Sequence, residues 1–178
     1  MSDANPYHPP DPLPARATGA RPYDPQYDGL RGWLILIGIG VLFSPLMLAR
    51  HLLDIIRNVF LSDAWSATTT AGSPAYHRLW APFISAEVVV TVLSLIVVIV
   101  MVPMFFSKKK IFPKVYIWLH VFTLIFVVAD AFALQMIRPD LPIFDPATAK
   151  EVGRCVFTVC VWVPYMMVST RVASTFRH

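Results

Sequence analysis

The chain has 178 residues, of which 56% are hydrophobic and only 15% are charged, and its formal net charge is +4. A soluble domain of this length carries a larger charged fraction, so the composition excludes an ordinary globular domain and favours an integral membrane protein. The basic residues lie at the ends of apolar segments, which predicts contact with anionic lipid and no binding of nucleic acid.

Residues 1–28 contain seven of the sixteen prolines of the chain, interspersed with aspartates. Such a segment buries too little apolar area to fold, so we expect a disordered, proline-rich tail. Its start lacks the basic region and apolar core of a signal peptide, so we expect no cleavage. A docking motif for a protein partner is the alternative interpretation of this tail.

Four apolar runs follow, at about 32–49, 82–106, 112–136 and 152–172. A helix that crosses a bilayer needs about 20 apolar residues, and each run has that length scale. We therefore expect one all-α membrane domain over residues 29–178, a polytopic four-helix bundle with short connections. The third run carries one carboxylate, Asp130, among apolar residues.

The first run contains features typical of a packed and kinked span. Gly32, Gly38 and Gly40 permit close approach of another helix. Pro45 predicts a kink, and the Ser44 hydroxyl can bind a backbone group that the proline leaves unpaired. Residues 51–60 then place apolar side chains on one face, which predicts a short amphipathic helix at the membrane surface.

Lysine and arginine positions predict the orientation. The turn between the second and third runs concentrates positive charge, whereas the connections at 50–81 and 137–151 are less densely basic. Since basic segments stay in the cytoplasm, we expect both termini and this turn there, with the turn contacting anionic lipid headgroups. The headgroup-binding residues are Lys108, Lys109, Lys110 and Lys114.

Charged residues at similar depth form the main candidate site. Asp130 lies sixteen residues beyond Lys114, hence about 24 Å along the helix axis. Arg50, Glu87 and Arg154 lie near the same outer level of the other three spans. Two positive and two negative groups balance, so we expect a cluster in which Asp130 pairs with Arg154. The cluster can be structural, fixing the helix register, or it can bind a ligand, a lipid headgroup or a proton.

Other reactive residues do not assemble into a site. His51 and His120 are expected at opposite depths, so they cannot clamp one haem iron, and no metal-ligand spacing occurs. Cys155 and Cys160 are five residues apart and fall on different helix faces, which favours packing thiols over a disulfide. We expect no cofactor and no enzymatic activity.

Scattered motifs between residues 29 and 177 resemble a bacterial inner-membrane family called domain of unknown function 2569. The residues that carry the resemblance are Gly29, Gly32, Trp33, Pro45, Pro113, Trp162, Pro164, Tyr165, Arg171 and Phe176. The resemblance implies a four-span protein of the bacterial inner membrane and implies no reaction. The proline-rich tail and the long 50–81 connection lie outside the shared pattern.

Two functions are therefore expected. The first is a non-catalytic accessory or structural membrane protein, with a protein partner or a second copy of the chain as its associate. The alternative is a small transporter or ligand-binding membrane protein that uses Glu87 and Asp130. A closed, dry bundle would favour the first function, and a cavity that reaches the middle of the membrane would favour the second.

Overall fold

The structure, a computed structural model, describes residues 29–177. The elements are α1 (Trp33–Ile55), η2 (Ile56–Phe60), α2 (Ala64–Thr69), α3 (Trp80–Phe106), α4 (Phe112–Ile137), α5 (Pro146–Val168) and α6 (Thr170–Thr175). Four helices are long and apolar enough to cross a membrane, so the all-α, four-span fold class is confirmed. The predicted tail at 1–28 lies outside the described residues.

Helix α1 is longer than its apolar run. Residues 50–60 are helical as expected, but they continue α1 through the π-helical turn η2 to make one helix of 28 residues. The short helix α2 follows this turn, within the 50–81 connection. Pro45 lies inside α1, and the Ser44 hydroxyl donates to the Val41 carbonyl at 2.9 Å. That carbonyl is the one that Pro45 leaves without its helical donor, so the predicted role of Ser44 is confirmed.

A tight turn connects α3 to α4. The amide of Lys109 donates to the Met104 carbonyl, and the amide of Lys108 donates to the Phe105 carbonyl. This pair of bonds is the Schellman motif, which ends a helix with one residue in the left-handed region. Lys108 occupies that position with φ 52°, where glycine is the usual residue.

Helix α5 begins and ends earlier than its apolar run. The Asp145 carboxylate accepts the Thr148 amide at 2.8 Å, and Pro146 follows at the first helical position. Both features are typical of a helix start. The chain leaves the helix at Ser169, which is extended and whose hydroxyl accepts the Val172 amide to start α6.

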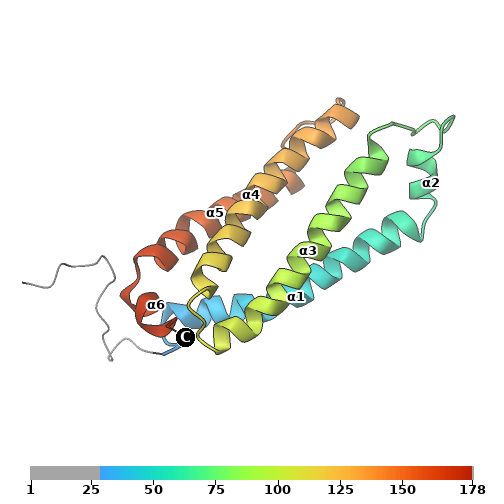
Figure 1. The fold of residues 1–178 in the computed structure, drawn as a ribbon. Helices are drawn as coiled ribbons and strands as arrows, with labels where there is room; N and C mark the ends of the chain where they lie inside the picture. The colour runs from blue at the N-terminus through green and yellow to red at the C-terminus, as the bar shows by residue number, and fades with distance from the viewer. Residues whose placement is uncertain (1–28, 178) are drawn as a thin grey trace, which may run out of the picture.

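The four long helices form two pairs. α1 packs along α3, α4 packs along α5, and the contact between α3 and α4 joins the pairs. Figure 1 shows the pairs converging near the α3–α4 turn, α6 and the C-terminus, and diverging towards α2 and the α4–α5 connection. We call these regions the lysine-turn end and the open end.

The core lies at the lysine-turn end. Phe105 of α3 and Phe112 of α4 are almost fully buried, with ring centroids 5.1 Å apart, and Phe176 stacks on Phe112 at 4.8 Å. Gly38 of α1 lies against this cluster, because a Cβ atom there would meet the Phe105 ring at 2.7 Å. The expected role of Gly38 in close helix packing is therefore met, whereas a Cβ atom at Gly40 would meet nothing within 4 Å.

Candidate ligand-binding cleft

A cavity of about 510 Å³ lies at the open end, between the two helix pairs. Its lining comes from the C-terminal part of α1, the N-terminal part of α3, the C-terminal part of α4 and the first turns of α5. The four charged residues that the sequence predicts as a cluster are among the lining residues: Arg50, Glu87, Asp130 and Arg154. The structure therefore brings them to one site, which we call the mouth cavity.

Three further titratable residues line the mouth cavity and were missed by the sequence reasoning: His51, Asp54 and Glu151. They fall in helical turns just beyond the apolar runs, within the stretches 50–81 and 137–151 that the sequence assigns to the connections between spans. Their spacing was the available signal, because Asp54 follows Arg50 by four residues and Glu151 precedes Arg154 by three, which are the separations of helical ion pairs.

The ion pairs of the mouth cavity differ from the expected one. The Arg154 guanidinium donates to the Glu151 carboxylate at 2.9 Å on its own helix, not to Asp130. Arg50 lies 3.9 Å from Asp54, and the His51 Nε2 atom lies 3.7 Å from a Glu87 oxygen across the α1–α3 contact. Both guanidinium groups thus pair with carboxylates on their own helices, and these carboxylates, Asp54 and Glu151, lie just outside the apolar runs.

The predicted balance of two positive and two negative groups does not hold once all the charged residues that line the mouth cavity are counted. Four carboxylates line the mouth cavity, and two guanidinium groups offset them. Among the described residues, Asp130 forms neither an ion pair nor a hydrogen bond, and a histidine is the only charged contact of Glu87. The mouth cavity therefore carries an excess of negative charge contributed by the two span carboxylates, Glu87 and Asp130.

A second cavity of about 460 Å³ continues from the mouth cavity towards the lysine-turn end, and we call it the inner cavity. The two cavities share lining residues, namely Met47, Leu48, Ser94, Thr123 and Arg154, so they adjoin, and we call the two together the cleft. The inner cavity extends along α4 to His120 and Tyr116, ten and fourteen residues before Asp130. At helical rise the cleft is thus about 20 Å long.

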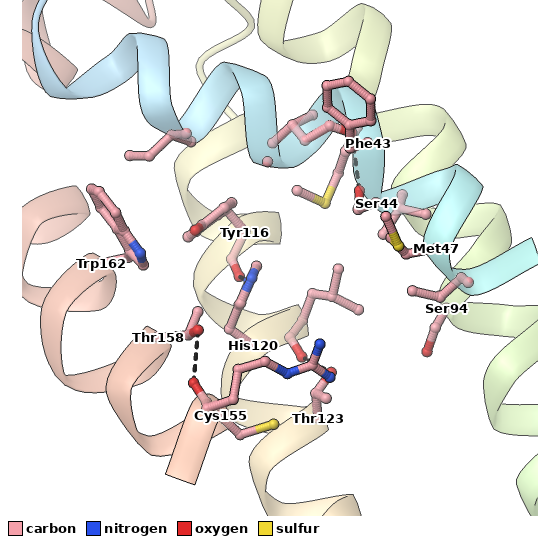
Figure 2. A pocket seen from close by; sticks show the side chains of 18 of the residues that line it. Phe43, Ser44, Met47, Ser94, Tyr116, His120, Thr123, Cys155, Thr158 and Trp162 are labelled. Atoms are coloured by element: carbon pink, nitrogen blue, oxygen red, sulfur yellow. Dashed lines mark hydrogen bonds between the residues drawn. The ribbon is translucent and has the colours of Figure 1, made fainter. Parts of the chain in front are cut away.

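Four polar side chains of the inner cavity are bonded to their own helices (Figure 2), whereas Ser94, Tyr116 and Trp162 keep their side-chain donors for other partners. The hydroxyls of Ser44, Thr123 and Thr158 each donate to a backbone carbonyl three or four residues earlier. His120 Nδ1 lies 2.8 Å from the Tyr116 carbonyl, so Nδ1 is the donor and Nε2 remains an acceptor. Leucine, isoleucine, valine and methionine side chains provide most of the remaining wall, so it presents few hydrogen-bond donors.

The inner cavity stops at the core of the lysine-turn end, where several motif residues gather. The Trp33 and Trp162 rings meet edge to face at 6.0 Å, and the Thr175 hydroxyl donates to the Gly29 carbonyl at 3.3 Å. Phe176 belongs to the aromatic core. These contacts hold both ends of the described chain together, so the shared motifs close one end of the cleft.

Other predicted residues lie away from the cleft or apart from one another. Lys108, Lys109, Lys110 and Lys114 surround the α3–α4 turn at the lysine-turn end. Cys155 is buried and Cys160 is exposed, as their spacing predicts for different helix faces. His51 lines the mouth cavity and His120 lines the inner cavity, at opposite ends of the cleft.

These features define an all-α protein with four helices that can span a membrane and with a cleft open at one end. The chain belongs to the family described as protein of unknown function (DUF2569), whose model matches residues 27–177. No curated protein and no solved structure matches the chain.

Proposed function

We propose that this protein is a non-catalytic, multi-pass membrane protein that binds a small cationic ligand in the mouth cavity. The observation that carries the proposal is the pairing pattern of the site. Glu87 and Asp130 lie on membrane-spanning helices and line a cavity, yet no arginine or lysine among the described residues pairs with either of them. Carboxylates without an arginine or lysine partner in such a place are costly, and a bound cation would offset that cost.

The geometry favours binding over passage through the bundle. The cleft ends at the buried rings of Phe105, Phe112 and Phe176, which pack across the lysine-turn end. A transport cycle would have to break this core in order to open the second side. The proposal therefore concerns a site that loads from the open end.

A structural role of the charges is the second candidate, and two ion pairs favour it. Arg50 with Asp54 and Arg154 with Glu151 neutralise one another within their helices. In that case the charged turns fix the helix ends and the protein serves as an accessory subunit in a complex with a protein partner or with a second copy. Ligand binding that depends on Glu87 and Asp130 separates the two candidates.

We place the protein in the bacterial inner membrane with the lysine-turn end in the cytoplasm. Support comes from the basic residues next to the elements of that end: Arg31 just before α1, the four lysines of the α3–α4 turn, Arg171 in α6 and Arg177 just after it. Basic residues are retained on the cytoplasmic side, where the turn can contact anionic lipid. Reporter fusions after residue 177 and within residues 70–75 test this orientation, and an external signal from the first fusion would refute it.

The binding proposal is tested with the purified full chain in mild detergent and with n-butylammonium chloride as the probe. We expect a saturable rise in the unfolding temperature beyond that produced by sodium chloride at equal ionic strength, because a ligand of the folded state stabilises it. Glu87→Gln and Asp130→Asn should each weaken the effect by about tenfold in half-saturating concentration.

Asp63→Asn is the matched control. Asp63 precedes α2 at the same end of the molecule, its side chain makes no cap hydrogen bond, and it does not line the mouth cavity. This variant should respond to butylammonium as the wild type does. An equal response in Asp130→Asn, or no response beyond the salt control in the wild type, would refute the proposal.

A further inference from the structure

The two parts of the cleft, the mouth cavity and the inner cavity, differ in the chemistry of their walls. Four carboxylates line the outer part, and the wall of the inner part is mainly apolar, with aliphatic, methionine and aromatic side chains from α1, α3, α4 and α5. The two parts adjoin at Ser94 and Thr123, which border both cavities. An occupant that fills the whole cleft must therefore be cationic at one end and apolar at the other.

The hydrogen bonding of the inner wall favours a hydrocarbon occupant there. A polar solute needs donors and acceptors from the wall, because an unpaired polar group away from water is costly. The hydroxyls of Ser44, Thr123 and Thr158 already donate to backbone carbonyls of their own helices. What remains is a mainly apolar wall, to which Ser94, Tyr116 and Trp162 contribute the remaining hydrogen-bond donors, and such a wall suits a hydrocarbon chain better than a polar solute.

The mouth cavity selects the headgroup by charge and by hydrogen bonding. Its carboxylates only accept hydrogen bonds, and a primary ammonium group has three donors and no acceptor. Arg50 and Arg154 lie at the same level but are bound to carboxylates on their own helices. An anionic headgroup would be repelled by the carboxylates of Glu87 and Asp130, and both guanidinium groups of the mouth cavity already pair with other carboxylates.

We propose that the cleft binds a single-chain amphiphile with a protonated amine headgroup, whose head lies between Glu87 and Asp130 and whose chain fills the inner cavity. The inference rests on the proposed cation site and deepens it by naming the class of ligand. A cleft about 20 Å long admits the head and most of a medium-length chain in an extended conformation.

The test uses Trp162, which lines the inner cavity, as a position-specific reporter (Figure 2). The probe is a dodecylamine with bromine at the end of its chain, a quencher of tryptophan fluorescence, added to the full chain in phosphatidylcholine nanodiscs. Trp118 is 74% exposed on the outer side of α4 and reports partition into the bilayer. Trp33, Trp65 and Trp80 are replaced by phenylalanine in every variant, so that Trp118→Phe leaves Trp162 as the reporter of the cleft and Trp162→Phe leaves Trp118 as the reporter of the bilayer.

We expect saturable quenching in Trp118→Phe that unbrominated dodecylamine reverses, and only weak, unsaturated quenching in Trp162→Phe. A dodecanol with bromine at the end of its chain should not give saturable quenching, because it lacks the positive charge. In the Trp118→Phe background, Asp130→Asn should raise the half-saturating amine concentration at least tenfold, and Ser94→Phe, which fills the junction of the cavities, should abolish saturation.

The outcomes separate this inference from the cation site. Stabilisation by butylammonium without saturable quenching of Trp162 by the long amine would overturn the amphiphile and leave the cation site standing. Quenching that the alcohol reproduces, or that Asp130→Asn leaves unchanged, would also overturn it. Failure of both amines would refute the inference together with the proposed function.

Discussion

The two ends of this molecule contrast in how their helices meet. At the lysine-turn end, Phe105, Phe112 and Phe176 fill the space between all the long helices, and both ends of the described chain close over them. At the open end, the same helices enclose a cavity of about 510 Å³ lined by charged residues. The contrast indicates that stability is concentrated at one end, which leaves the other end available for binding.

The aromatic core should give the largest stability effect. Phe105→Ala removes an almost fully buried ring that touches both Phe112 and Phe176. We expect a loss of about 3 kcal/mol in the free energy of unfolding, dominated by the cavity and lost contacts, since lipid reduces the transfer contribution. Reversible unfolding in mixed micelles measures it. Phe106→Ala, at a half-exposed neighbour, is the control, and equal losses would contradict a core at this end.

Gly38 should give the next largest effect. In Gly38→Ala the new Cβ atom would meet the Phe105 ring at 2.7 Å, so α1 and α3 must separate or the ring must shift. Overpacking of this kind costs about 1–3 kcal/mol. Gly40→Ala on the same helix meets nothing within 4 Å and should be neutral or slightly stabilising. Thermal unfolding of both variants tests the close approach, which would be refuted if they behaved alike.

The α3–α4 turn offers a stabilising change at the packed end. Lys108 adopts φ 52° in the Schellman turn, which costs a residue with a Cβ atom about 1 kcal/mol. Lys108→Gly should therefore raise the free energy of unfolding by up to that amount. Lys110 is not in the left-handed region, so Lys110→Gly relieves no backbone strain and should slightly lower the free energy of unfolding. A destabilised Lys108→Gly variant would show that the lysine side chain outweighs the backbone strain.

Removing a negative charge and removing a positive charge at the open end should change the stability of the protein in opposite directions. Asp130→Asn removes one of the excess carboxylates and should leave the apo protein equally or more stable, whereas Arg154→Gln removes the partner of Glu151 and should destabilise it. We expect changes within about 1 kcal/mol, because these pairs are solvent-screened. Detergent stability of the two single variants checks the signs. A loss in Asp130→Asn as large as in Arg154→Gln would instead support the Asp130–Arg154 pair expected from sequence.

Asp145 should give the smallest effect, and one that depends on pH. Hydrogen bonds from the side chain and the backbone of Thr148 lower the pKa of Asp145 below its usual value. Its contribution is therefore present above the unfolded-state pKa and is lost as the pH falls through the lower folded-state pKa. Asp145→Ala should lower the unfolding temperature at neutral pH but not in strong acid, and Asp145→Ser should retain much of the cap. Equal effects at both pH values would contradict an ionised cap.

The contrast between the ends also explains what the sequence could predict. The four spans follow from apolar runs of bilayer length, and the helix boundaries are accurate for α3 and α4. The apolar runs of α1 and α5 border charged turns at the open end, so the extension of α1 was expected to lie at the membrane surface and the first turn of α5 was counted with the 137–151 connection. Those extensions carry His51, Asp54 and Glu151, which is why the mouth cavity was only partly predicted.

The position of the core was beyond the reach of the sequence. A soluble helix marks its buried face with an apolar stripe, but a span is apolar on all sides, so the pattern does not show which face packs. Phe105 and Phe112 therefore looked no different from the exposed Phe106. Likewise, Ser94 and Thr123 carried no sign that they border a cavity.

The most direct test of an open cleft and a closed core is the reactivity of single cysteines towards a water-soluble thiol reagent. The variants are Ser94→Cys, Leu93→Cys and Thr175→Cys in a chain with Cys155 and Cys160 replaced by alanine, in nanodiscs that expose both membrane faces. Ser94 borders both cavities, Leu93 is exposed on the outer side of α3, and Thr175 is buried at the lysine-turn end. The account predicts rapid labelling of Ser94→Cys alone, slowed by butylammonium. Protection of Ser94→Cys equal to that of Thr175→Cys would contradict the cleft.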